Sequence, residues 1–220
     1  MPPRRRLIKR NDESDYFRLE NQDGSLRGLL ARGRRSYVIG QIPDHTLDTV
    51  VAFPHTPRSL FQPRADLATM MGRTAALTSP KLKEDGVLLY RETWLHTPIT
   101  PTFIAKYKTL HVITIKDKPL PDQRLFILSR TGNAPDGAEA WPTAIDRSKG
   151  TSLVEIVGDL RHGKVLLDLY PGKTKIGIQA AEKASLSWMA IEPQVQQAQA
   201  IIDESWANAP TPDWYYIFRP

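Results

Sequence analysis

The sequence predicts a β-rich α+β fold, built mainly from antiparallel sheets with two short helices. Runs of β-branched and aromatic residues recur along the chain, and Gly, Pro, Asn and Asp separate them at short intervals. The last seventy residues hold four such runs with short connections, a pattern typical of an antiparallel meander. Hydrophobic residues make up 40% of the chain and charged residues 25%, so wholesale disorder is not expected. A mainly-β barrel or sandwich is the alternative architecture.

The N-terminal elements are predicted in the following order. A basic flexible arm covers residues 1–15. An Asp-Gly pair between residues 16–20 and 25–30 predicts a hairpin, because a tight primed turn requires positive φ angles. Residues 36–42 and 49–53 are rich in β-branched side chains and are predicted strands.

A short helix is predicted over residues 63–72. Pro63 suits a first helical turn, Asp66 suits the positive helix terminus, and Gly72 suits the end. The side chains expected on its buried side are Leu67, Met70 and Met71.

Three further strands are predicted in the middle of the chain, over residues 87–95, 103–115 and 124–129. Residues 131–150 are rich in Gly, Pro, Asp and Ala, so this segment is the best linker candidate. Residues 16–150 are expected to form a β-rich N-terminal part. This part is expected to make one compact domain with residues 151–220.

The C-terminal part carries the most regular pattern. Four strands are predicted there, over residues 152–158, 164–170, 175–179 and 185–191. A helix over 192–207 and a final strand over 214–218 are predicted to follow. The element order over residues 151–208 is similar to that of the Whirly and PUR-type single-strand-binding families. This resemblance implies a sheet that binds single-stranded nucleic acid, and it transfers no individual site residue.

The positive charge of the chain is concentrated at its start. Residues 1–10 carry five cationic side chains and no acid, whereas the whole chain has a net charge of +6, which leaves +1 for residues 11–220. Such an arm attracts polyanions through Coulomb attraction and counterion release. A solubilising tail and a targeting address are the alternatives for this segment.

Several classes of chemistry are excluded by the residues themselves. The chain has no cysteine, which rules out disulfides and thiolate chemistry, and it lacks the glycine patterns of serine hydrolases and of phosphate-binding loops. The segment Pro171-Gly-Lys-Thr174 has Leu167 where a phosphate-binding loop has glycine, and it precedes a predicted strand, so a hairpin turn is expected there. The five histidines lack metal-ligand spacing. We therefore expect no cofactor and no metal.

Basic and aromatic residues indicate binding more than catalysis. Lys106 and Lys108 flank Tyr107 and should face away from it, and His162 lies between cations in a predicted turn. The residues expected to contact nucleic acid are Arg4, Arg5, Arg6, Lys9, Arg10, Arg32, Arg34, Arg35, Lys106, Lys108, Arg161, His162 and Lys164.

Three functions remain open at this point. The first is a non-enzymatic nucleic-acid-binding protein, with DNA and RNA equally possible partners. The second is a self-assembling viral capsid or matrix-type subunit, and the third is a metal-independent enzyme acting on nucleic acid. A homo-oligomer is expected, in an intracellular compartment or a virion, with no transmembrane segment because no apolar run approaches ~18 residues.

Overall fold

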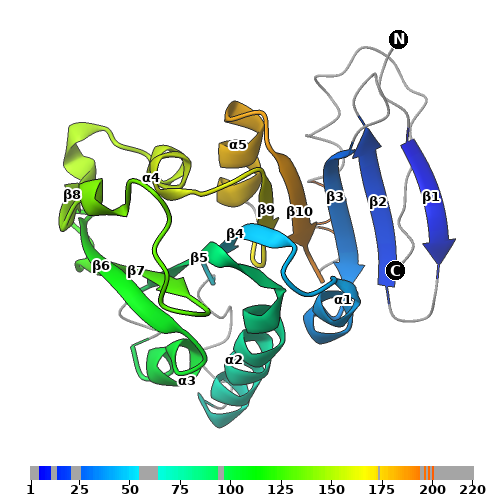
Figure 1. Ribbon diagram of the computed structural model, residues 1–220, viewed down its shortest axis with the longest axis horizontal. Helices are drawn as coiled ribbons and strands as arrows, with labels where there is room; N and C mark the ends of the chain where they lie inside the picture. Colours follow the sequence, from blue (N-terminus) through cyan, green and yellow to red (C-terminus); the bar gives the residue numbers. More distant parts are fainter. Residues whose placement is uncertain are drawn as a thin grey trace.

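The computed structural model describes residues 5–10, 14–20, 26–54, 64–93, 97–172 and 174–193, together with positions 196, 198 and 200. Within these residues, ten strands form one mixed sheet with helices on both faces (Figure 1). The strand order is β1-β2-β3-β10-β9-β4-β5-β7-β6-β8. The strands are β1 (Arg5–Arg10), β2 (Ser14–Glu20), β3 (Leu26–Gly33), β4 (Leu47–Ala52), β5 (Leu82–Glu92), β6 (Lys108–Lys116), β7 (Gln123–Ser129), β8 (Ala144–Asp146), β9 (Val165–Asp168) and β10 (Ser187–Ile191).

The centre of this sheet is parallel. Strands β3, β10, β9, β4 and β5 all run in one direction, and their carboxyl ends meet at one side, which we call the carboxyl edge. The opposite side is the amino edge. Strand β7 is antiparallel to β5 and β6, and β8 runs parallel to β6. The prediction of an antiparallel fold, and its barrel or sandwich alternative, are therefore wrong.

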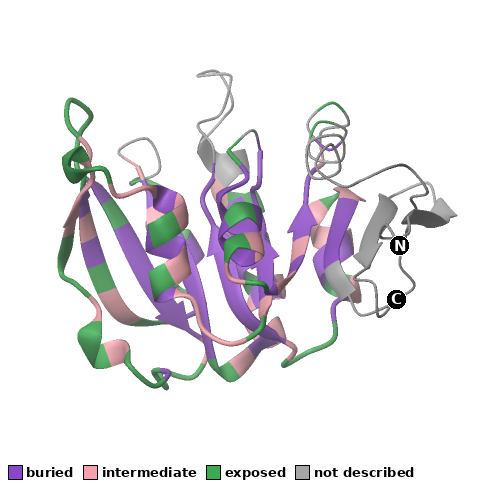
Figure 2. Ribbon diagram, turned by 90° about the horizontal axis from the view of Figure 1, so that it is seen from above, coloured by how far each residue is buried: buried purple, intermediate pink, exposed green. Residues whose placement is uncertain are grey.

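The helices cover the sheet in two layers. Helices α1 (Arg35–Gln41), α2 (Arg64–Thr78) and α3 (Thr100–Ile104) pack on one face, while α4 (Leu153–Leu160) and α5 (Ile176–Lys183) pack on the other. Figure 2 looks onto the α4–α5 face, where buried strands lie behind helices whose outer sides are exposed. Both faces of the central strands are thus removed from water, which explains their nearly continuous apolar runs.

Residues 152–158, predicted as a strand, begin helix α4. Its buried side chains are Leu153, Ile156, Val157 and Leu160, which recur at helical spacing. Ser152 and Glu155 exchange hydrogen bonds in a complete capping box, which satisfies backbone donors at the start of the helix. The helical spacing is present in the sequence, but the same segment is also rich in β-branched residues, which favour a strand.

Residues 175–179, also predicted as a strand, form the first part of α5. Strands β9 and β10 are neighbours and parallel, so the chain needs a crossover to return to the starting edge of the sheet. Helix α5 provides it. The unit is β9–α5–β10 rather than a meander, so the resemblance in element order to Whirly and PUR-type proteins does not hold.

Two predictions in the first half are also corrected. Residues 36–42 form helix α1, in which Val38 and Ile39 are buried, and the capping residue Ile42 is buried as well. Residues 103–115 begin in helix α3, and strand β6 starts only at Lys108. In both cases a β-branched composition suggested a strand, but packing against the sheet selected a helix.

Other elements agree with the sequence. Strands β2 and β3 pair as the predicted antiparallel hairpin, and β4, β5, β7, β9 and β10 overlap predicted strands. Helix α2 was predicted but is longer, and it runs through Gly72. Of its expected buried residues, Met71 is buried and Met70 is 41% exposed, while Leu67 lies outside the residues whose side chains the structure describes.

The remaining expectations concern the two ends and the linker candidate. Arg5–Arg10, expected within a flexible arm, form strand β1 on the edge of the sheet beside β2. The segment 131–150 contributes β8 and two short 3-10 helices, η2 (Ala138–Ala140) and η3 (Arg147–Lys149). The helix predicted over 192–207 lies mostly outside the described residues, and the strand predicted over 214–218 lies entirely outside them. Among the helices described, none has both the length and the apolar character that a bilayer crossing requires.

Candidate functional site

The sheet changes winding direction between β9 and β4, its two central strands. From β9 the chain crosses through α5 to β10 on one side, and from β4 it passes through α2 to β5 on the other. The two crossover helices lie on opposite faces (Figure 1). In open α/β sheets a crevice forms at such a switch point, outside the carboxyl ends of the strands, and ligands bind there.

Asp168, the last residue of β9, organises this point. It is 1% exposed, and its carboxylate accepts hydrogen bonds from Tyr170 N at 3.1 Å and from Gly177 N at 3.0 Å. Burial raises the pKa of Asp168 to about 7, against the opposing effect of these backbone donors. Because Gly177 lies in the first turn of α5, the carboxylate ties the end of β9 to the start of the helix.

The turn between Asp168 and α5 is compact. Gly172 has a φ of 47° and Lys175 a φ of 48°, and Lys175 N donates to Pro171 O at 2.8 Å. Lys175 is 5% exposed, and burial lowers its pKa. The turn has one glycine before the helix, unlike the three of a dinucleotide-binding fingerprint, so it offers no glycine-rich cradle for a pyrophosphate.

Glu192 follows directly after β10 at the same edge. It is 3% exposed, and its backbone N–H donates to Ala31 O at 2.9 Å, which fixes the end of β10 beside β3. Glu192 stands twenty residues after Gly172. In βαβ nucleotide sites an acid at about this spacing accepts hydrogen bonds from ribose hydroxyls. The spacing of Glu192 matches this pattern.

Arg35 connects β3 to the turn after β9. Its Nε donates to Leu169 O at 2.7 Å, and its guanidinium lies 4.2 Å from the centre of the Tyr170 ring. Tyr170 is 6% exposed and donates its hydroxyl to Met71 Sδ at 3.1 Å. Arg35 thus fixes the turn after β9 by a hydrogen bond and a cation–π contact.

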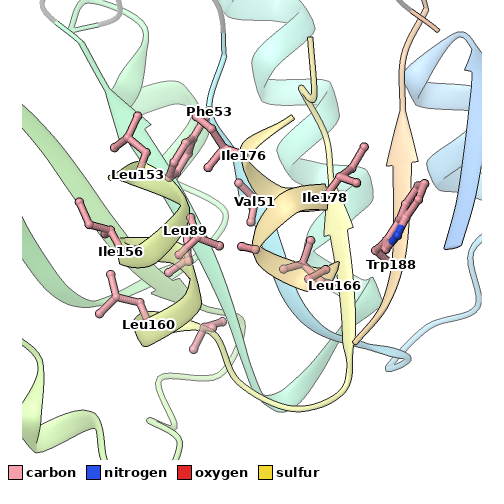
Figure 3. Packing of buried hydrophobic residues seen from close by; sticks show 14 of the residues in the cluster. Val51, Phe53, Leu89, Leu153, Ile156, Leu160, Leu166, Ile176, Ile178 and Trp188 are labelled. Carbon is pink, nitrogen blue, oxygen red and sulfur yellow. The ribbon is translucent and has the colours of Figure 1, made fainter. Parts of the chain in front are cut away.

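The end of β4, which lies beside β9 at the same edge, is apolar. Ala52, Phe53 and Pro54 are buried and carry no polar side-chain atom. Figure 3 shows Phe53 beside Leu153 of α4 and Ile176 of α5. Among the described residues, no group of three His, Asp or Glu side chains is arranged to hold a metal ion.

The residues predicted to bind nucleic acid fall on different sides of the molecule. Arg32, Arg34 and Arg35 lie at the carboxyl edge, where β3 passes into α1. The members at the amino edge are Lys106, Lys108, Arg161, His162 and Lys164, which precede or begin β6 and β9. Arg5, Arg6, Lys9 and Arg10 lie on β1, and Arg4 lies outside the described residues. No single surface brings the set together.

Arg161 and His162 do line a cavity of about 850 Å³ between α4 and the segment 135–151. His162 Nε2 lies 2.9 Å from Asp85 Oδ2, and its backbone N–H and C=O both bond to Thr49 Oγ1. His162 therefore links the turn before β9 to β4 and β5 at the amino edge. Tyr107 is buried and Lys106 and Lys108 are exposed, although only Lys108 of the three lies on a strand.

Asp168 and Glu192 were not identified from the sequence. A usable signal existed, because an apolar strand ends in an acid, a glycine turn follows, and a second acid stands twenty residues on. The segment Pro171–Thr174 was predicted as a hairpin turn because the following residues were read as a strand. That turn in fact opens helix α5, so this prediction was wrong.

Solved structures share this fold at low sequence identity. The PvuII DNA methyltransferase (cytosine-N4-specific) is 10% identical, with a TM-score of 0.63 over 79% of this chain and 84% of that one. A Thermus thermophilus protein provisionally assigned as a DNA modification methylase, complexed with S-adenosyl-L-methionine, is 16% identical, with a TM-score of 0.62 over 80% and 93%. The M1.HpyAVI-SAM complex is 14% identical, with a TM-score of 0.55 over 80% and 97%. No family model and no curated protein matches the sequence. The likeness establishes that the chain has the fold of these methyltransferases.

Proposed function

We propose that this chain binds S-adenosyl-L-methionine at the carboxyl edge of the sheet and acts on DNA as a methyltransferase. The observation that carries the proposal is the β9–α5–β10 unit, in which Asp168 fixes the turn and Glu192 directly follows the next strand. The three structural neighbours named above are, by their descriptions, DNA-modifying enzymes or complexes with this cofactor.

The residues present suit a nucleoside cofactor without phosphates. Glu192 would hold the ribose, since a buried carboxylate at the end of β10 accepts hydroxyl donors well. Asp168 would keep the turn in place through its backbone hydrogen bonds. The absence of a glycine-rich turn disfavours a dinucleotide. When bound, S-adenosyl-L-methionine supplies a methyl group to an attacking nucleophile.

A second candidate, binding of the cofactor and DNA without methyl transfer, is favoured by the apolar end of β4. Methylation of a base amino group requires a neighbouring acceptor that orients the amine and receives its proton. Ala52, Phe53 and Pro54 offer none at the strand beside β9. This observation bears on the described residues only, since 55–63 lie outside them.

DNA contact is proposed for the cations at the same edge. Arg34 is exposed at the start of α1, and Arg35 lies next to the crevice. Cationic side chains at the rim of a site hold phosphates without reading the sequence. The basic residues of β1 add to this attraction at longer range.

Calorimetric titration of the full chain with S-adenosyl-L-methionine tests the cofactor, with NADH as a phosphate-containing competitor. We expect binding of the first ligand and none of the second. Glu192→Gln should weaken the affinity roughly 10-fold or more, since a charge-assisted hydrogen bond to ribose is lost. The matched control is Glu84→Gln, an exposed position at the amino end of β5, which should bind as the parent does.

Transfer of a tritiated methyl group to duplex DNA separates the two candidates. Incorporation that Glu192→Gln lowers at subsaturating cofactor would support the methyltransferase. Cofactor binding with no incorporation into DNA or RNA would support the non-transferring candidate. Failure of the parent chain to bind S-adenosyl-L-methionine at millimolar concentration would refute both.

A further inference from the structure

A second polar cluster lies at the carboxyl edge, beyond β4 and on the α4–α5 face of the sheet. It consists of Arg91 on β5, Gln123 on β7, Asp117 after β6 and Arg147 after β8. Arg91 and Gln123 lie on this face because they alternate with Leu89 and Leu125, which belong to the core beneath α4 and α5. None of these four residues belongs to the switch point between β9 and β4.

The cluster contains more positive than negative charge. Asp117 forms an ion pair with Arg147 and accepts a hydrogen bond from Gln123 Nε2 at 3.4 Å. Glu92, which follows Arg91, points to the other face and is paired with Arg124 Nε at 2.6 Å. Two guanidinium groups therefore share one carboxylate, and that carboxylate is already engaged.

Arg91 is the exceptional member. Its guanidinium lies 5.2 Å from the centre of the Phe53 ring, and its Nε is buried without an acceptor among the described residues. Burial lowers the pKa of Arg91, and the nearby Arg147 lowers it further while Asp117 opposes the change. Buried charges are ordinarily paired, because an unpaired buried charge loses its hydration without compensation.

Other buried groups in the cluster also lack partners. Arg147 Nε and Gln123 Oε1 are buried without hydrogen-bond partners in the part of the chain that the structure describes. Gln123 as a whole is only 7% exposed. Buried polar atoms in native proteins are normally satisfied, so three of them in one cluster indicate a missing partner. Two of the three are guanidinium donors, which suit an anion.

We propose that Arg91 and Arg147 form an anion site at the carboxyl edge that binds a carboxylate or phosphodiester group. Guanidinium groups bind the paired oxygens of either anion with two parallel hydrogen bonds. The site lies beside the proposed cofactor crevice, because the Arg91 guanidinium stacks over the ring of Phe53, which follows β4. Strand β5 is two strand spacings, about 10 Å, from β9. The anion could come from the amino-acid end of the cofactor or from a DNA phosphate. Only this choice of source rests on the proposed function.

The test compares the full chain with Arg91→Met, Arg91→Lys and Arg73→Met. Methionine keeps an unbranched apolar stem against Phe53 but removes the charge. Lysine keeps the charge without the planar fork and should retain part of the affinity. Arg73 is exposed on α2, away from the cluster. Arg73→Met therefore removes the same charge as Arg91→Met and serves as the control.

Inorganic sulfate is the first probe, measured as the rise in Tm against chloride at equal ionic strength. We expect the sulfate affinity of Arg91→Met to fall roughly 10-fold or more, as for the loss of a charge-assisted bond. Arg73→Met should match the parent. If all variants respond to sulfate alike, the proposal is overturned. A lower Tm of ligand-free Arg91→Met with unchanged sulfate affinity would likewise show that Arg91 serves the fold.

Two further ligands identify the source of the anion. S-Adenosyl-L-methionine is compared with methylthioadenosine, which has the same nucleoside and sulfur but no carboxylate. If Arg91→Met weakens only the first, the site holds the cofactor carboxylate. If it weakens only a DNA duplex, the site holds a phosphate. Should the parent fail to bind S-adenosyl-L-methionine, the proposed function fails, while sulfate and DNA still decide the anion site.

Discussion

Gly177 lies directly against the carboxylate of Asp168. Its N–H donates to Oδ2 at 3.0 Å, and a Cβ atom at this glycine would stand 2.6 Å from the same oxygen. This contact joins the last residue of β9 to the first turn of α5, so the shape of the proposed cofactor turn depends on it. No residue with a side chain can approach the buried carboxylate in this way.

Gly177→Ala should destabilise the protein by about 2–4 kcal/mol, the range for overpacking combined with loss of a buried hydrogen bond. It should also abolish binding of S-adenosyl-L-methionine, because the turn would shift. Urea unfolding and calorimetric titration measure the two effects. Gly158→Ala is the control, since a Cβ there meets nothing within 4 Å in α4. That variant should gain about 0.5–1 kcal/mol of stability. Equal stabilities for the two variants would contradict the packing described here.

The pKa of Asp168 predicts an unusual pH dependence of stability. The value rises from 3.8 to about 7 on folding, so the folded state binds the extra proton between these values. The contribution of this group to the free energy of unfolding is therefore greatest below pH 4. It is lost as the pH rises through about 7, and the loss is a few kcal/mol at most. Asp168→Asn should lose this slope, as measured by denaturant unfolding between pH 4 and 8. A parent and variant with parallel profiles would show that Asp168 titrates normally.

Asp48 should show the opposite sign. Burial alone would raise its pKa, but Lys83 and the backbone N–H groups of Lys164 and Val165 outweigh burial and lower it. Its contribution is therefore complete above its ordinary value of 3.8 and disappears as the pH falls through the lowered pKa. Asp48→Asn should cost about 1–3 kcal/mol at pH 7 and progressively less under acidic conditions. A cost that stays constant down to pH 2 would contradict this reasoning.

Replacement of His162 tests the division between the two edges. His162→Ala removes a pair with Asp85 at the exposed amino edge, and should cost less than about 1 kcal/mol. Cofactor affinity should stay unchanged, because the carboxyl ends of β9 and β10 lie at the opposite, carboxyl edge of the sheet. A marked loss of affinity would place part of the site at the amino edge.

Deletion of residues 1–10 tests the role of the basic segment. The deletion removes five cations and strand β1, which among the described strands pairs only with β2, so the rest of the sheet should remain folded. Affinity for duplex DNA should fall, and its logarithmic salt slope should decrease by up to about 4.5, or 0.9 per phosphate contact. The measurement is binding to a labelled duplex across salt concentrations. An unchanged slope would make these residues passive in DNA binding.

The local order of the chain determined part of this structure. The hairpin of β2 and β3, the cores of β4, β7, β9 and β10, and the presence of α2 follow from short-range patterns. The concentration of cations in residues 1–10 is likewise a property of the sequence alone. These features depend on composition, turn residues and spacing, which act over a few neighbours.

The tertiary structure decided the direction of the strands and the place of the site. Ile176 and Ile178 alternate like a strand, but β9 and β10 pair in parallel, and a parallel pair requires a crossover that only a helix here supplies. Once α5 forms, Asp168 and Glu192 come to one edge although they are distant in sequence. Arg91 and Arg147 meet for the same reason, through pairing of β5, β7, β6 and β8. Long-range pairing is selected by burial on both faces of the sheet, which no local pattern specifies.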